Sequence, residues 1–178
     1  IQAVTTLFIF VGGVNFVLMY RLLRADYKPM MQNSEFRTYT LIFFLIGGMM
    51  MFELLQGGMA STQAAIHGFF QSASVLSSTG YSTHSIMGLS IVLQLIFIGL
   101  MFVGGSLGST AGGWKVFRLR AMIELLKTRL RAYSLPESAI NEVKMDGEIL
   151  DNAAVRTISV LFFTWVTVIF FGTILTMI

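Results

Sequence analysis

Four long apolar runs and one short one dominate the hydrophobic pattern of the chain. The long runs cover residues 1–23, 38–56, 86–103 and 154–178. A helix of about 20 apolar residues spans the roughly 30 Å hydrocarbon layer of a bilayer. The pattern therefore predicts helices that cross a membrane, joined by polar connections.

The short apolar run, residues 64–77, is too brief to cross a bilayer and favours a re-entrant half-helix. The polar stretch 77–85 would then lie at membrane depth, where irregular backbone is tolerated only against protein or a water-filled cavity. A second interruption comes at 104–113, where five of ten residues are glycine. Glycine disfavours a helix interior by about 0.8–1 kcal/mol relative to alanine. We therefore expect the preceding helix to break there and to resume as an amphipathic helix at 114–131.

Composition and charge agree with a membrane protein. Of the 178 residues, 55% are hydrophobic and only 12% are charged, and the mean hydropathy is +0.76. All twelve Lys and Arg residues lie at 21–37, at 115–144 or at Arg156. Because positive residues concentrate in cytoplasmic loops, we place the two basic regions on the cytoplasmic side. They flank bilayer-length runs and lack interleaved aromatic residues, which argues against nucleic-acid binding.

Ser78, Thr79, Gly80 and Tyr81 follow the short run and have the composition of a potassium filter. A potassium ion enters such a filter when backbone carbonyls replace its hydration shell, and glycine permits the required backbone turn. The C-terminal end of a helix at 64–77 carries about half an elementary negative charge and would face the ion. The alternative is an ordinary extracellular turn that contains a glycine.

Several segments resemble a known family. The chain contains FFQSASVLSSTGYSTHS, FVGGSLGSTAGGWKVFR and LPESAINEVKMDGEIL, and near its start FVGGVNF and NSEFRTY. The first three resemble the third pore repeat of the membrane subunit of Trk/Ktr-type potassium transporters, in the Trk branch. The other two resemble the end of the second repeat and the connection after it. The resemblance implies an all-α, multi-pass protein of the cytoplasmic membrane with a pseudo-fourfold pore, of which Ser78, Thr79, Gly80 and Tyr81 line one quarter.

On this basis the chain contains one complete helix–pore loop–helix repeat, with a re-entrant half-helix and a broken second helix. We expect five parts: the second helix of a preceding repeat at 1–24, a cytoplasmic linker at 25–37, the complete repeat at 38–131, a cytoplasmic segment with a short hairpin at 132–153, and the first helix of a following repeat at 154–178. Within the complete repeat we expect a pore helix at 64–77, the filter at 78–82 and a gate loop at 104–113. Because one filter quarter is present and the ends are apolar, we expect an excerpt of a longer protein.

The resemblance also implies that the glycine-rich stretch obstructs the pore beneath the filter in the closed state. The gate residues would be Gly104, Gly105, Ser106, Gly108, Ser109, Thr110, Gly112, Gly113 and Lys115. The alternative is a helix face that packs through a repeated Gly-x-x-x-Gly ladder. A phosphate-binding loop is excluded, because Trp114 stands where that motif requires lysine and no Ser or Thr follows Lys115. We expect no enzyme.

The implied function is potassium uptake across the cytoplasmic membrane, with K⁺ as the transported ion and no cofactor. The implied partners are the lipid bilayer, a second subunit in a homodimer, and a cytoplasmic nucleotide-binding regulatory ring. The residues alone leave two alternatives open. One is a secondary transporter that binds another cation or solute at a discontinuous helix. The other is a membrane scaffold that transports nothing.

Four further polar residues carry separate expectations. Asn15 is expected to form a hydrogen bond between helices rather than to bind an ion. Glu53 either concentrates cations at the pore entrance or is simply solvated. His67 and His84 have no partner at metal-ligand spacing, so we expect no metal site from them.

Overall fold

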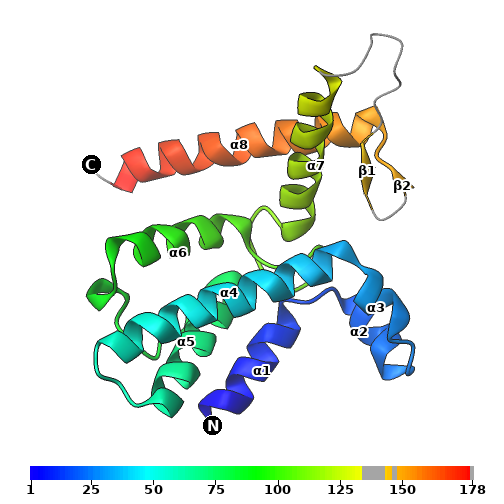
Figure 1. Cartoon of the computed structure of the whole chain (residues 1–178). Helices are drawn as coiled ribbons and strands as arrows, with labels where there is room; N and C mark the ends of the chain where they lie inside the picture. Colours follow the sequence, from blue (N-terminus) through cyan, green and yellow to red (C-terminus); the bar gives the residue numbers. More distant parts are fainter. Residues whose placement is uncertain (134–142, 146–147, 177–178) are drawn as a thin grey trace. The chain divides into compact units, whose positions relative to one another are not determined.

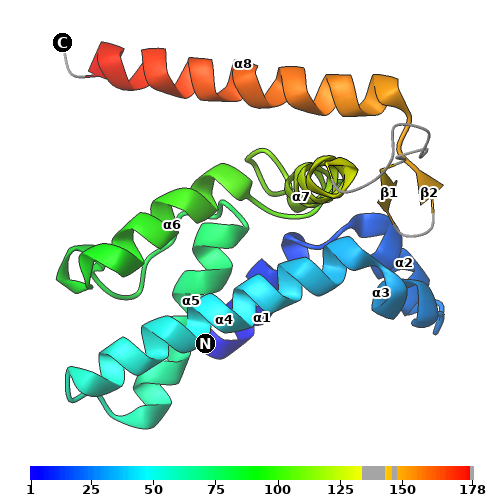
Figure 2. The same ribbon diagram turned by 45° about the horizontal axis from the view of Figure 1, so that its top comes forward.

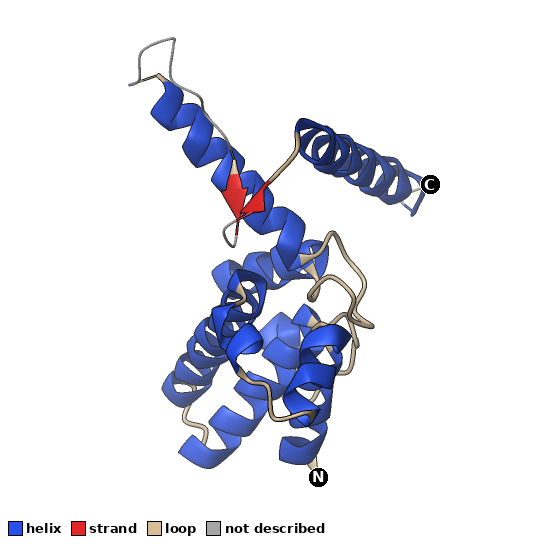
Figure 3. Ribbon diagram, turned by 90° about the vertical axis from the view of Figure 1, so that its right-hand side faces the viewer, coloured by secondary structure: helices blue, strands red, loops and turns tan. Residues whose placement is uncertain are grey.

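The computed structural model describes residues 1–133, 143–145 and 148–176, which are almost entirely helical (Figure 1, Figure 3). They form two compact units, residues 1–116 and 117–178, and we describe each by itself. The elements are α1 (Gln2–Gly12), α2 (Phe16–Leu23), α3 (Lys28–Gln32), α4 (Ser34–Gln56), α5 (Ser61–Leu76), the short 3-10 helix η1 (Ile86–Gly88), α6 (Ile91–Val103), α7 (Val116–Ala132), β1 (Lys144–Met145), β2 (Glu148–Ile149) and α8 (Asn152–Thr176).

In the first unit, the short helix α5 is enclosed by its neighbours. It packs against α4, α1 and α6 (Figure 2). Helices α4 and α5 approach closely, because a Cβ atom at Gly68 would lie 2.7 Å from the carbonyl oxygen of Gly47. Small residues allow such close packing in membrane proteins. The core around α5 consists mainly of large apolar side chains: Tyr39, Phe43, Ile46, Met50, Leu76, Leu93 and Phe97.

Two of the described helices, α4 and residues 153–176 of α8, are long and apolar enough to cross a membrane. Helix α4 begins at Asn33, whose side-chain oxygen accepts a hydrogen bond from Phe36 N at 2.8 Å. Helix α5 is shorter, as predicted, although it starts at Ser61 rather than at residue 64. Helix α6 ends at Val103, and Gly104, the first residue of the glycine-rich stretch, is its C-cap. The prediction of a helix break there is confirmed.

The prediction of one continuous helix over residues 1–23 is wrong. Helices α1 and α2 meet at a bend of 111°. A Cβ atom at Gly13 would lie 2.1 Å from the hydroxyl oxygen of Tyr39, so this glycine lets Tyr39 pack into the bend. Asn15 then starts α2, because its side-chain oxygen accepts from Val17 N at 2.8 Å. The hydrogen bond of Asn15 that the structure shows is thus a helix cap, and the expected bond between helices stays a prediction.

The second unit contains α7, the strands β1 and β2, and α8. Helix α7 begins at Val116 rather than at Trp114, and its Glu124 lies 2.9 Å from the amine of Lys127. Strands β1 and β2 pair antiparallel, with Lys144 opposite Ile149. They lie where the sequence predicts a hairpin, whose turn residues 146–147 are outside the described residues.

Candidate functional site: a carbonyl loop above a glycine-rich loop

The loop after α5 turns its amide hydrogens toward the helix. The N–H of Thr79 donates to the carbonyl of Ser74 at 2.9 Å, and the N–H of Gly80 reaches the same oxygen at 3.5 Å. Ser78 and Gly80 have φ angles of 58° and 81°, a left-handed region that glycine enters without strain. The amides of the candidate filter are thus occupied by the last turn of α5.

The carbonyls of the same segment have a different environment. Within the described residues, no N–H or O–H group donates to the carbonyl oxygens of Ser78, Thr79 or Gly80. All three residues are exposed. Three successive backbone oxygens are therefore available to an ion, as potassium coordination requires.

Two hydroxyl groups of α5 hold the ends of this segment. Ser77 and Thr79 place their hydroxyl oxygens 2.6 Å apart. The hydroxyl of Ser74 donates to the carbonyl of Tyr81 at 2.5 Å. Tyr81 therefore differs from the other three candidate filter residues, because its carbonyl is bonded.

The candidate gate residues form an irregular loop between α6 and α7. Three of its glycines, Gly104, Gly108 and Gly113, have positive φ angles. A Cβ atom at Gly104 would lie 2.1 Å from the carbonyl oxygen of Gly112, so the two arms of the loop touch through their backbones. The alternative of a helical Gly-x-x-x-Gly face is wrong, because these residues are not helical.

This loop is bonded to the bend between α1 and α2. The N–H groups of Ser106 and Thr110 donate to the carbonyls of Gly13 and Gly12, at 2.9 and 3.2 Å. In return, Phe16 N donates to the carbonyl of Gly108 at 3.1 Å. A broken helix leaves backbone groups without partners, and here each break supplies partners to the other. Both breaks begin with the same four residues, Phe-Val-Gly-Gly, at 10–13 and 102–105.

A buried carboxylate also holds the loop. Glu35, in the first turn of α4, is 5% exposed, and its Oε1 accepts from Leu107 N at 2.6 Å. Glu35 lies in a polar connection, so its position in the sequence alone does not predict this role. A signal was present: Glu35 is an acid at the start of a bilayer-length helix.

The candidate gate lies next to the candidate filter. A Cβ atom at Gly112 would lie 3.5 Å from the hydroxyl oxygen of Ser78. Lys115 has its amine on the loop itself, where it donates to the carbonyl of Ala111. The structure thus brings Ser78 and the glycine-rich loop together, although 34 positions separate Ser78 from Gly112 in the sequence.

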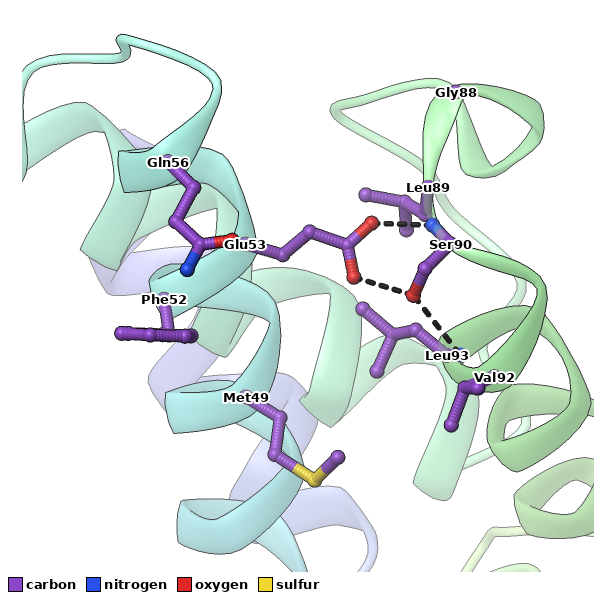
Figure 4. Close-up of a pocket in the computed structure, with 9 residues that line it drawn as sticks. All are labelled: Met49, Phe52, Glu53, Gln56, Gly88, Leu89, Ser90, Val92 and Leu93. Carbon is purple, nitrogen blue, oxygen red and sulfur yellow. Dashed lines mark hydrogen bonds between the residues drawn. The ribbon is translucent and has the colours of Figure 1, made fainter.

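Glu53 has a structural role that neither sequence interpretation anticipated. Its carboxylate accepts from both the N–H and the hydroxyl of Ser90, the latter at 2.6 Å, and so joins α4 to the start of α6 (Figure 4). This contact crosses a pocket of about 520 Å³, lined mostly by apolar side chains such as Met49 and Leu93. The two bonds to Ser90 explain an acidic residue at position 53 without any contact to a cation.

Replacing Glu53 with alanine is expected to lower the free energy of unfolding by about 1 kcal/mol, because two hydrogen bonds at an exposed helix start are lost. The measurement is thermal unfolding of the full-length protein in detergent. Glu53→Gln, which keeps one acceptor oxygen, should lie between alanine and the parent. If the protein transports potassium, as the family resemblance implies, uptake should stay near the parent rate in Glu53→Gln; a clear fall would instead favour cation attraction at the entrance.

The two histidines form no metal cluster. His67 Nδ1 lies 3.0 Å from the hydroxyl of Thr83, and the rings of His67 and His84 are 6.0 Å apart. Within the described part of the chain, no group of three His, Cys, Asp or Glu residues could hold a metal ion. The nearest partners of His67 instead belong to the loop after the filter.

Known proteins are similar to this chain along its whole length. The family model TrkH, described as a cation transport protein, matches residues 1–178. The Trk system potassium uptake protein TrkI of Halomonas elongata is 29% identical over 165 residues, which are 92% of this chain and 33% of that protein. The Trk system potassium uptake protein TrkG of Escherichia coli is 26% identical over 167 residues, 93% of this chain and 34% of that protein. The chain therefore spans about a third of the length of these relatives.

A solved structure has the same fold. The crystal structure of the potassium transporter TrkH from Vibrio parahaemolyticus superposes with a TM-score of 0.82 over 90% of this chain and 35% of that chain, at 23% sequence identity. At this identity the likeness shows the fold, an all-helical membrane architecture.

Proposed function

Because this chain belongs to the TrkH family of cation transport proteins, we propose that it is part of the membrane subunit of a potassium uptake system and supplies one quarter of its ion filter. The family consists of transport proteins, so the chain is not an enzyme. Membership also argues against a membrane scaffold without transport. The location we propose is the cytoplasmic membrane, crossed several times.

One observation carries the filter proposal. The amides of Thr79 and Gly80 are directed to Ser74, whereas the carbonyls of Ser78, Thr79 and Gly80 have no donor among the described residues. The C-terminal end of α5 adds partial negative charge at the same place. This combination favours a dehydrated cation over an anion or a neutral solute, and it supports Ser78, Thr79 and Gly80 as the lining. Tyr81, whose carbonyl accepts from Ser74, belongs to the proposed filter on the family resemblance alone. The other three quarters would come from repeats outside this chain.

The experiment that tests the proposal uses the full-length protein in a bacterial strain without other potassium uptake. Growth at low external potassium should be restored, and purified protein in liposomes should take up K⁺ in preference to Na⁺. A protein that inserts normally but gives no potassium-dependent growth and no K⁺ flux would contradict the proposal.

We also propose that the loop 104–113 is the gate, with Lys115 directly after its C-terminal end. Its support is its contact with Ser78 and its set of bonds to Gly12, Gly13 and Glu35. Small residues allow this loop to fill the pore compactly, and its movement would open the path. The proposal includes the division into repeats that the family resemblance implies. Residues 1–24, 38–131 and 154–178 would be parts of successive pore repeats, joined by the linker 25–37 and the cytoplasmic segment 132–153.

Replacing Glu35 with alanine is expected to raise potassium flux in the resting state by about tenfold, because Leu107 loses a charged hydrogen-bond acceptor worth roughly 1.5 kcal/mol at the low end of the usual range. The measurement is K⁺ efflux from liposomes without any activating partner. Glu35→Gln is the matched control, since its amide oxygen still accepts from Leu107, and it should stay closer to the parent. Equal flux in all three proteins would exclude Glu35 as a latch of the loop.

Two partners are part of the proposal. The full-length subunits would form a homodimer, and a cytoplasmic ring that binds nucleotides would regulate them. Helix α7 carries Arg118, Arg120, Lys127, Arg129 and Arg131, and the positive charge of these residues would attract an acidic surface of such a ring. The test is co-purification of the full-length protein with a candidate ring protein, with and without nucleotide.

A further inference from the structure

We propose that Gln71 is a specificity-determining residue of the pore: from inside α5 it positions the outer end of the filter loop and thereby sets the preference for K⁺ over smaller cations. The inference deepens the proposed function and rests on the filter assigned above. Gln71 does not touch the ion in this proposal. It acts through Ser82 and Thr83.

Gln71 is a buried polar side chain with its hydrogen bonds directed at this loop. It is 1% exposed. Its Nε2 donates to the hydroxyl oxygen of Ser82 at 3.2 Å, and its Oε1 accepts from Thr83 N at 3.4 Å. The donor and the acceptor of this amide are thus both hydrogen-bonded to the two residues that follow Tyr81.

The hydrogen-bond directions are consistent through the whole chain of contacts. The hydroxyl of Ser82 has only one hydrogen to donate. Its oxygen lies 2.6 Å from the carbonyl oxygen of His84 but 3.3 Å from Gln71 Oε1. Ser82 therefore donates to His84 and accepts from Gln71. Thr83, the next residue, is also held at its side chain by His67, at 3.0 Å.

These contacts belong to a ladder that pairs one face of α5 with the returning loop. Residues 67, 71 and 74 lie three or four positions apart, which places them on one helix face. Ser74 bonds Tyr81, Gln71 bonds Ser82 and Thr83, and His67 bonds Thr83. The loop therefore runs antiparallel to α5: later residues of the loop contact earlier residues of the helix.

The ladder decides where the free carbonyls point. Among the described residues, no group donates to the carbonyl oxygens of Ser78, Thr79 and Gly80, so their orientation depends on what holds the segment at each end. Ser77 contacts Thr79 at the inner end. At the outer end Ser74 holds Tyr81, and Gln71 holds the next two residues. Discrimination between cations depends on the number and placement of coordinating carbonyls. Loss of the outer support would let these oxygens shift and adapt to a smaller ion.

The adjacent residue provides a matched control. Ser72 is also fully buried on α5, but its hydroxyl donates to the carbonyl of Phe43 on α4, at 2.9 Å. Removing it deletes one buried hydrogen bond of the same helix without touching the loop. A general weakening of α5 and a specific loss of loop support are therefore separable.

The experiment measures the K⁺ to Na⁺ uptake ratio of the full-length protein in liposomes. Gln71→Leu, of similar size and without hydrogen-bonding groups, is expected to lower the ratio by about fivefold, since two bonds are lost. Ser82→Ala should lower it in the same direction, and the double variant should fall little further than Gln71→Leu, because the contact between Gln71 and Ser82 is already lost in Gln71→Leu. Ser72→Ala should keep the parent ratio even where its thermal stability falls.

Each outcome decides the inference. An unchanged ratio in Gln71→Leu overturns it, and so does an equal fall in Ser72→Ala, because the effect would then come from helix packing. Should Gln71→Leu fail to insert, Ser82→Ala decides alone: it changes an exposed residue, and a parent ratio there overturns the inference. A parent protein that does not prefer K⁺ contradicts the proposed filter itself, whereas a selective parent with a selective Gln71→Leu contradicts only the role of Gln71.

Discussion

Replacing Gly80 with alanine is expected to reduce the preference of the full-length protein for K⁺ over Na⁺ by about tenfold, because an L-residue in left-handed backbone carries roughly 1–2 kcal/mol of strain. The φ angle of Gly80 is 81°, and no atom lies within 4 Å of the position that a Cβ would occupy. The effect would therefore come from the backbone, which relaxes by turning the neighbouring carbonyls, and not from a steric clash. The measurement is competitive uptake of K⁺ and Na⁺ in liposomes.

Gly58 offers a closely matched control for this change. It has a φ angle of 85° and equally open surroundings, but it lies in the connection between α4 and α5. Gly58→Ala carries the same kind of strain outside the candidate filter and should leave the K⁺ to Na⁺ ratio unchanged. If both variants lose selectivity equally, or neither does, Gly80 has no special part in ion choice.

Replacing Gly104 with valine is expected to raise the resting potassium flux by about tenfold, which corresponds to a shift of about 1.4 kcal/mol toward the open state. A side chain at this position would collide with the carbonyl of Gly112, and the backbone there has a φ angle of 71°. The closed arrangement of the loop is destabilised, whereas a displaced loop can accept the side chain. The measurement is K⁺ efflux from liposomes at equal amounts of inserted protein.

The control for the loop variant is Gly99→Ala in α6. No atom lies within 4 Å of a Cβ there, and Gly99 belongs to the regular helix just before the loop. Its resting flux should match the parent. A Gly104→Val protein that inserts normally and remains as tight as the parent would show that the loop does not close the pore.

The sequence predicted those elements that depend on local pattern. The short helix α5 follows from an apolar run of limited length, and the break after Val103 follows from the density of glycine. Both are properties of consecutive residues. The family resemblance, carried by the segments around Gly80 and Gly112, is confirmed by the matching family.

The sequence did not predict the features that depend on contacts between distant segments. The bend at Gly13 lies inside an apolar run, and the ring of Tyr39 that packs against this glycine comes from another helix. Glu35 and Glu53 were hard to interpret because their partners, Leu107 and Ser90, are 72 and 37 positions away. A polar residue acquires its role from its partner, which a one-dimensional pattern does not show.

If the loop 104–113 is the proposed gate, the reciprocal bonds between the two helix breaks would link its opening to hydration. While the loop is in this position, the carbonyls of Gly12 and Gly13 accept from Thr110 and Ser106. When the loop leaves, those two oxygens lose these donors, and a lipid-like interior supplies no others. Water or the passing cations would therefore enter as the loop departs, so the pore would hydrate and open in one step.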